Sequence, residues 1–201
     1  DKLDSFPPQR EDLAYGRSMT GQWTFMEPTP NEPNLGNSYE GWLAPLQFSQ
    51  QRGILENPFT LRIDNSNTNS SILVSIDGAP PTDSYTAPLR ISGNTTVRAD
   101  VRREGFKSPR TQTHTYIYVE DTLNASNMNR SITGNAEYAN RLRKGMTDLP
   151  IISVSVSELP DDWDEREASV EFFLPDANPV QVNAGGKRFG GAWTEFTKKN
   201  Y

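Results

Sequence analysis

The feature that most restricts the fold is a series of short segments between residues 46 and 119 in which apolar and polar side chains alternate. Five such segments are separated by stretches rich in Asn, Asp, Gly, Ser and Pro: Phe59–Asp64, Ser71–Asp77, Ala87–Ser92, Thr95–Arg102 and Thr113–Val119. A period of two is typical of a β-strand with one buried face, and the intervening residue types favour turns. Strands at this spacing, with no helical period between them, predict a small antiparallel β-sandwich.

Two turns inside this region contain residues with specific backbone roles. Asp77 and Gly78 predict a tight reversal, and Asp83 and Ser84 after it are expected to hydrogen-bond to the local backbone. In a second turn, Gly105 permits a positive φ, so that the next residue tucks under the sheet. These residues are interpreted as architectural rather than chemical.

The N-terminal segment, residues 1–47, is predicted to be extended. Pro28, Pro30 and Pro33 interrupt any helix or central strand, and only Gln22–Met26 reads as a short strand. Since this segment has little capacity for a core of its own, we expect it to wrap along a neighbouring subunit.

Residues 121–148 are interpreted as a linker that contains one short helix. Apolar residues at steps of three and four, with basic residues late in the segment, predict a helix over Asn135–Lys144 that ends at Gly145. Residues 149–201 then predict a smaller β unit, with strands at 149–156, 168–174 and 179–186.

Composition and charge exclude several classes of protein. The chain has 201 residues, which allows one large or two small domains. Its formal net charge is −6, and its richest basic run is the short segment 141–145, so nucleic-acid binding is not expected. Cysteine is absent, which excludes thiolate metal sites. No apolar run approaches the roughly 18 residues that span a bilayer. The start at Asp1 predicts a mature, cleaved or excised piece of a longer polypeptide.

The order and spacing of residues from about 53 to 119 resemble the small β-sandwich repeat named after the C-terminal domain of chitobiase and β-hexosaminidase. This resemblance implies a non-catalytic spacer or accessory domain of a large secreted protein. The matching residues are Asp77, Gly78, Pro81, Thr82, Ser84, Tyr85, Pro88, Leu89, Ile91, Thr95, Thr96, Val97, Arg98, Ala99, Gly105, Phe106 and Ser108.

The segment Tyr15–Asn34 resembles the last strand and exit of bacterial lamin-tail-like domains, of which only this closing part is present. The residues that carry the similarity are Gly16, Arg17, Gly21, Trp23, Pro28, Thr29, Pro30 and Asn34.

The C-terminal residues resemble the opening of the spore-coat CotH kinase-like family. The matching residues are Leu149, Pro150, Ser153, Glu165, Arg166, Ala168, Ser169, Val170, Glu171, Asn183, Ala184, Gly185, Gly190, Gly191, Lys198 and Lys199. The order of the three resemblances implies a large surface-exposed protein of an environmental bacterium.

The candidate site for chemistry is a phosphate site near the C-terminus. Gly185, Gly186, Gly190 and Gly191 would let backbone amides approach a phosphate, and Lys198 or Lys199 would pair with it. Tight β-hairpins use glycine equally often, and the carboxylates that hold Mg²⁺ in the CotH-like family lie beyond Tyr201.

Other candidates have simpler interpretations. The acidic run Glu158–Glu167 lacks the spacing of a Ca²⁺ loop, and we interpret it as a solvated loop with Trp163 tucked inward. A lone His114 does not build a metal site. Seven aromatic residues are interpreted as packing residues, with sugar stacking as the alternative: Trp23, Trp42, Tyr85, Tyr116, Tyr118, Trp163 and Trp193.

Together these predictions describe a mainly β chain with an immunoglobulin-like antiparallel β-sandwich over 48–120, a short helix and a smaller C-terminal β unit. We expect a non-catalytic structural or adhesive module, without cofactor or metal, that contacts protein subunits of an extracellular or cell-surface assembly. The periplasm is an alternative location. Two other functions stay open: a carbohydrate-binding accessory module that holds a polysaccharide, and the N-terminal lobe of a CotH-like protein kinase.

Overall fold

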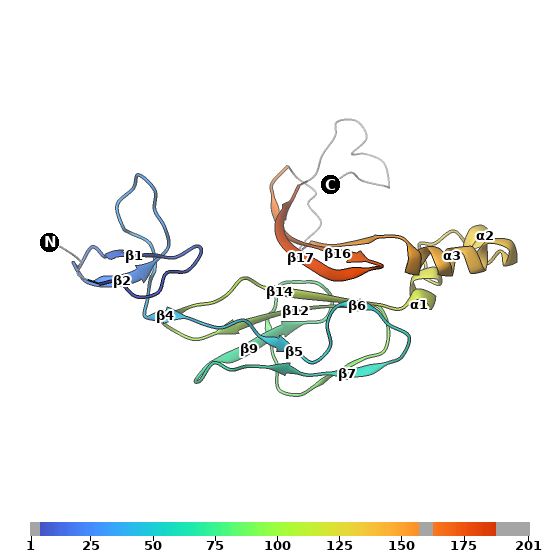
Figure 1. Cartoon of the computed structure of the whole chain (residues 1–201), viewed down its shortest axis with the longest axis horizontal. Coiled ribbons are helices and arrows are strands. Elements are labelled where there is room, and N and C mark those ends of the chain that lie inside the picture. The colour runs from blue at the N-terminus through green and yellow to red at the C-terminus, as the bar shows by residue number, and fades with distance from the viewer. Residues whose placement is uncertain (1–4, 157–162, 188–201) are drawn as a thin grey trace.

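The computed structural model describes residues 5–156 and 163–187. In this part the chain is mainly β, with several sheets and three short helices, so the predicted fold class is confirmed. Figure 1 shows an N-terminal sheet at one end, a central sandwich, a C-terminal sheet over the sandwich and the helices at the other end. The immunoglobulin-like topology and the domain bounds remain predictions.

The centre of the molecule is a five-stranded sheet in the order β10-β9-β12-β14-β6. Its pairs are antiparallel except for β14 and β6, which run parallel. The strands are β6 (Gly53–Ile54), β9 (Ser71–Ser75), β10 (Asp83–Ser84), β12 (Thr95–Arg102) and β14 (Gln112–Ile117).

One face of this sheet forms the hydrophobic core. Val97, Ala99 and Val101 alternate along β12 and are buried against a second layer of short paired strands. That layer contributes Leu61 and Ile91, which are also buried. Its strands are β5 (Gln47–Phe48) with β8 (Ile63–Asp64), and β7 (Phe59–Leu61) with β11 (Leu89–Ile91). Burial of this apolar face is the main stabilising term of the sandwich.

The predicted strands are found, but several are shorter than their alternating pattern. Asp83 and Ser84 form strand β10 rather than a turn that bonds back on itself, because β9 supplies ladder partners. The turn before them is closed by Asp77, whose Oδ1 accepts the backbone N–H of Ala79 at 3.0 Å. Gly78 and Gly105 have φ of +83° and +74°, as their predicted roles require.

The N-terminal segment is not extended throughout, which corrects the prediction for residues 1–47. Strands β1 (Ala14–Arg17), β2 (Trp23–Met26) and β3 (Ser38–Tyr39) form an antiparallel sheet. The ring of Tyr15 contacts both Trp23 and Phe25, with centroids 5.7 and 5.0 Å apart. These aromatic contacts across the strands stabilise a sheet whose strands are too short to show a clear period.

The N-terminal sheet is joined to the sandwich by a short parallel strand pair and by ion pairs. Strand β4 (Gly41–Trp42) pairs with β13 (Phe106–Lys107). The Nζ of Lys107 donates to Glu27 Oε1 at 2.6 Å, and Arg110 lies 2.5 Å from Asp12.

The predicted helix extends beyond Gly145, so the prediction that it ends there is wrong. Helix α3 spans Ala136–Asp148, and the N–H of Leu149 still donates to the carbonyl of Gly145. The helix ends before Pro150, because the residue that precedes a proline disfavours helical φ and ψ. Two helices too short to show a period were missed: α1 (Val119–Leu123) and α2 (Arg130–Thr133).

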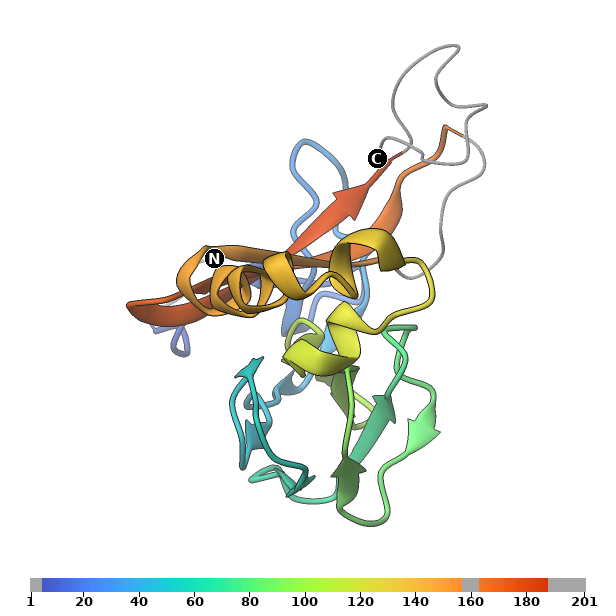
Figure 2. The ribbon, with the colours of Figure 1, turned by 90° about the vertical axis from the view of Figure 1, so that its right-hand side faces the viewer.

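The C-terminal sheet has three antiparallel strands in the order β15-β16-β17. They are β15 (Ile151–Val156), β16 (Arg166–Leu174) and β17 (Ala177–Gly186). This sheet contacts the face of β12 and β14 that points away from the hydrophobic core. The central sheet is therefore covered on both faces, as the two views in Figures 1 and 2 show.

Candidate interaction surface

The outer face of the C-terminal sheet is entirely apolar over three successive rows of paired residues. The strand register places one residue of each strand in each row. The rows are Ile152, Phe172 and Val180; then Val154, Val170 and Val182; then Val156, Ala168 and Ala184. We call these nine residues the apolar face. Side chains in such rows lie side by side on one surface of a sheet.

The opposite face of the same sheet is largely polar and points toward the central sandwich. Two of its rows are Ser153, Glu171 and Gln181, and Ser155, Ser169 and Asn183. Ser169 and Glu171 are completely buried. The sheet is thus inverted relative to an ordinary surface sheet, which buries its apolar side and exposes its polar side.

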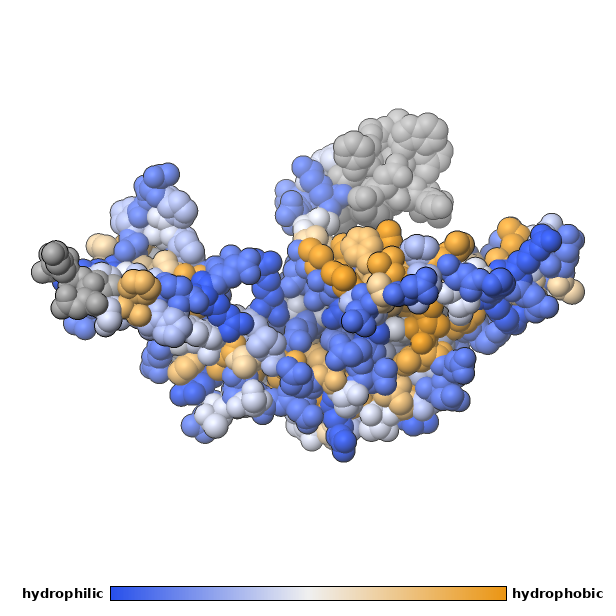
Figure 3. Space-filling view, in the orientation of Figure 1, coloured by the Kyte–Doolittle hydropathy of each residue, from blue (hydrophilic) through white to orange (hydrophobic). Residues whose placement is uncertain are grey.

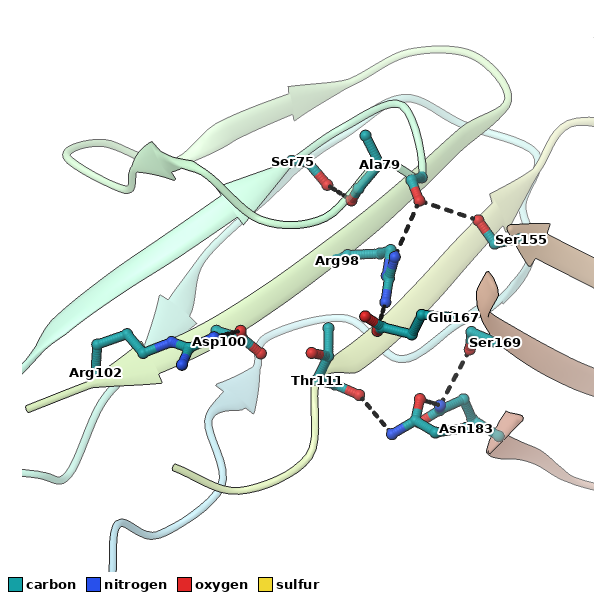
Figure 4. Close-up of polar contacts among 12 residues, drawn as sticks. Ser75, Ala79, Arg98, Asp100, Arg102, Thr111, Ser155, Glu167, Ser169 and Asn183 are labelled. Carbon is teal, nitrogen blue, oxygen red and sulfur yellow. Dashed lines mark hydrogen bonds and ion pairs between the residues drawn. The ribbon is translucent and has the colours of Figure 1, made fainter. Parts of the chain in front are cut away.

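Hydrogen bonds and ion pairs fix this polar face on the central sandwich, and the close-up in Figure 4 shows those of Arg98 and Asn183. Arg98 of β12 is completely buried, donates to the carboxylate of Glu167 through Nη2, and reaches the carbonyl of Gly78 through Nη1 at 3.4 Å. The amide of Asn183 donates to the carbonyl of Thr111 at 3.1 Å. A buried guanidinium needs a counter-charge. The ion pair with Arg98 therefore keeps the face of β16 that contains Glu167 turned toward β12.

Glu171 is the most deeply placed carboxylate of this contact. Its Oε1 accepts the backbone N–H of Thr115 at 3.0 Å, its Oε2 accepts the hydroxyl of Thr115, and Arg52 lies 3.5 Å away. Burial raises the pKa of Glu171, and the hydrogen bonds from Thr115 and the charge of Arg52 oppose that shift. Burial also lowers the pKa of the Arg52 guanidinium. The pair is therefore an orienting contact that costs desolvation energy.

Most of the apolar face is exposed in the described residues, whereas Ala168 in its third row is buried. Five of its side chains expose between 38% and 60% of their surface: Ile152, Val154, Phe172, Val180 and Val182. Figure 3 shows hydrophobic residues gathered at the position of β16 and β17. Within the described residues, β15 and β17 each pair only with β16, so both edges of the sheet are open too. Contiguous exposed apolar patches are uncommon on soluble proteins, and many of them are interaction sites.

A second feature is a charged cleft of about 780 Å³ between the N-terminal sheet, the sandwich and the C-terminal sheet. Its basic groups have acidic partners: Arg102 lies 2.6 Å from Asp100, and Lys107 is bonded to Glu27. The hydrogen bond from Lys107 is the largest cause that lowers the pKa of Glu27. Because these basic and acidic groups neutralise one another, the cleft has no net charge that would favour a charged ligand.

The predicted phosphate site is only partly within the described residues. Gly185 and Gly186 lie at the end of β17, paired with Glu167 and Arg166. The side chain of Glu165 occupies the space beside Gly185, so a phosphate would meet a like charge there. The other four candidates lie outside the described residues: Gly190, Gly191, Lys198 and Lys199.

The remaining candidates separate into packing residues and one correction. Tyr116 and Tyr118 are buried, and His114 stacks on Phe48 with centroids 3.9 Å apart. Burial lowers the pKa of His114 to about 3. Trp163 is 56% exposed rather than tucked inward, because no apolar surface of the described chain covers it. Part of the acidic run, residues 158–162, and Trp193 lie outside the described residues.

Sequence reasoning identified the strands of the apolar face but not the face itself. The signal was present, because Ile152, Val154 and Val156 alternate with serines, and Val180 and Val182 alternate with polar side chains. The pattern states which residues share a face, whereas the direction of that face depends on the neighbouring sheet.

The described residues contain neither a metal site nor a helix fit to cross a membrane. Residues 5–156 and 163–187 contain no group of three or more His, Asp or Glu placed to hold a metal ion. None of their helices combines the length and apolar character that a bilayer crossing requires. In comparisons with known proteins, no family model, curated protein or solved structure matches this chain.

Proposed function

We propose that this chain is a non-catalytic structural module that makes protein–protein contacts through its apolar face. The single observation that carries the proposal is the inverted C-terminal sheet, whose three outward rows contain only apolar residues. Exposure of these side chains to water is unfavourable, and docking of another apolar surface removes that cost.

The inward polar contacts support the same function. A sheet that buries Glu171 and pairs Glu167 with the buried Arg98 is held with its apolar side outward by specific bonds. A simple reversal of the sheet would leave Arg98 without its counter-charge, which is costly. The sandwich below it then acts as a rigid support for the docking face.

The resemblances of the sequence to modules of large surface proteins support an extracellular or cell-surface location for this assembly. They also raise the two alternative functions. The alternative of sugar binding rests on exposed aromatic rings, but Trp23, which is 39% exposed, already stacks on Tyr15 and lies under the guanidinium of Arg17. These contacts occupy ring surface of Trp23 that a sugar would need, so the sugar-binding alternative depends on Trp163, which is 56% exposed.

Three measurements on the purified chain test the proposal together. At a low chain concentration of about 1 μM, we expect a dye that fluoresces on apolar surfaces to bind the wild type and to bind Val182→Glu much less. Mg·ATP should leave the melting temperature unchanged, and a polysaccharide column of chitin or cellulose should not retain the chain. A rise in melting temperature with Mg·ATP that is lost in the Lys198→Ala, Lys199→Ala double variant would establish the kinase-lobe alternative instead. Retention on the column that Trp163→Ala abolishes would establish the carbohydrate-binding alternative.

A further inference from the structure

We infer that the surface docked on the apolar face is the apolar face of a second copy of this chain. This inference rests on the proposed function and names its partner. The partner must itself present an exposed apolar surface of matching size and flatness, and few soluble proteins do so. The described part of this chain presents one. A second copy presents that face at the same concentration as the first.

The chemistry of the face favours a partner of identical composition. The nine residues of the apolar face include no charged or hydrogen-bonding side chain. A polar or charged partner would therefore lose its water without gaining any bond from this face. Two copies packed face to face bury apolar groups only, in the same way as the two inner faces of a β-sandwich.

The size of the face fits a weak dimer. Five side chains with 38% to 60% of their surface exposed, together with the neighbouring Leu174 at 43%, form a patch on the order of 500 Å². Two such patches bury about 1,000 Å², which is the lower limit for a specific interface. We therefore expect a dissociation constant on the order of 10 μM.

The charges at the ends of the β16–β17 hairpin select the relative orientation of the two copies. Asp176 is exposed in the turn between the strands, and Lys187 is exposed just after Gly186 at the other end. β17 has ten residues, which separate these charges by roughly 30 Å. If the strands of the two copies run antiparallel, each Asp176 lies near the Lys187 of the other copy. A parallel arrangement would bring the two Asp176 side chains together at one end, and the two Lys187 side chains, each near an exposed Glu165, at the other.

Sedimentation equilibrium of the purified chain from about 1 to 200 μM tests the inference. We expect a monomer–dimer equilibrium that Val154→Glu and Val182→Glu weaken at least about tenfold, because each places a charge in the apolar interface. Leu35→Glu is the matched control: Leu35 is an exposed apolar residue of the N-terminal loop, 70% open, and its replacement should leave the equilibrium unchanged. Unchanged melting temperatures verify that all variants are folded.

Charge exchange tests the antiparallel orientation separately. Asp176→Lys and Lys187→Asp should each weaken the dimer about fivefold, since both ion pairs of the symmetric dimer become repulsive. The double variant should restore the wild-type dissociation constant. Equal weakening by the double variant would overturn the orientation.

The outcomes separate this inference from the proposed function. A chain that stays monomeric at all concentrations overturns the second-copy inference. If that monomer still binds the apolar dye and Val182→Glu does not, the docking function stands and its partner is another protein. If the monomer binds no dye, a segment of the chain itself covers the face, and both the inference and the proposed function fail.

Discussion

Glu171 of strand β16 accepts two hydrogen bonds from Thr115 of strand β14, one of them from the backbone N–H at 3.0 Å. The two residues are 56 positions apart in the sequence, and Glu171 is completely buried. Because this carboxylate is bonded to the backbone of another sheet, it fixes the distance of strand β16 from β14 and determines which face of β16 points toward β14. This contact therefore explains why the C-terminal sheet presents its apolar side to solvent.

The Glu171→Gln variant should change how stability depends on pH. Because the folded-state pKa of Glu171 is raised above 4.5, the folded protein retains a proton that the unfolded chain releases. The wild type therefore loses free energy of unfolding as the pH rises above 4.5, whereas the amide of the variant does not titrate. We expect the stability of the wild type, relative to the variant, to fall from pH 4.5 toward neutrality in urea titrations. A constant difference across this range would contradict the raised pKa.

Removal of the carboxylate that neutralises Arg98 should destabilise the protein. Glu167→Gln leaves a completely buried guanidinium without its ion-pair partner, and Glu167 is half exposed, so we expect a loss of about 1–3 kcal/mol in the free energy of unfolding. Glu104→Gln removes an exposed carboxylate of the same length and serves as the control. Equal free energies of unfolding for the two variants would show that burial of the Arg98 charge does not require the carboxylate of Glu167.

The contact between the turn of Gly78 and the C-terminal sheet can be measured with a pair of glycine variants. Gly78 and Gly21 have nearly the same φ, +83° and +79°. A Cβ at Gly78 would lie 2.5 Å from Ser155 Oγ, whereas a Cβ at Gly21 meets nothing within 4 Å. Gly21→Ala should cost about 1 kcal/mol from backbone strain. Gly78→Ala should cost about 0.5–1 kcal/mol more, because the hydroxyl of Ser155 must rotate away and lose its hydrogen bond to the carbonyl of Gly78. Equal costs in thermal unfolding would mean that the sheet is not seated on this turn.

The His114→Phe variant should remove a source of acid sensitivity. Burial lowers the pKa of His114 from 6.5 to about 3. Below pH 6.5 the unfolded chain therefore binds a proton at this histidine, whereas the folded protein keeps it neutral. Stability is therefore lost as the pH falls below 6.5, by about 2 kcal/mol between pH 6.5 and 5. The phenyl ring of the variant retains the stacking on Phe48 without titrating. Parallel stability curves of wild type and variant over this range would exclude a neutral buried histidine.

Much of the fold could be predicted from local pattern. The alternation along Thr95–Arg102 predicted strand β12 with its bounds, and Gly105 was expected at a positive φ, which the structure confirms. Of the N-terminal sheet, only strand β2 was predicted, as Gln22–Met26. Strand β1 and the short helices α1 and α2 were not, since elements of four or five residues are too short to show a period. The contact of Tyr15 with Trp23 stabilises the pairing of β1 with β2 in the N-terminal sheet.

The sequence by itself determined which side chains share each face of the C-terminal sheet, because successive residues of a strand point to opposite sides. Only the tertiary structure decided which face points inward. Hydrophobic burial alone favours an inward apolar face, but the central sheet places Arg98 and the backbone of Thr115 opposite this sheet. Those groups are satisfied only by polar partners, which come from residues 56 to 69 positions away. The energy of these long-range pairs, which no local pattern contains, turns the apolar rows toward solvent.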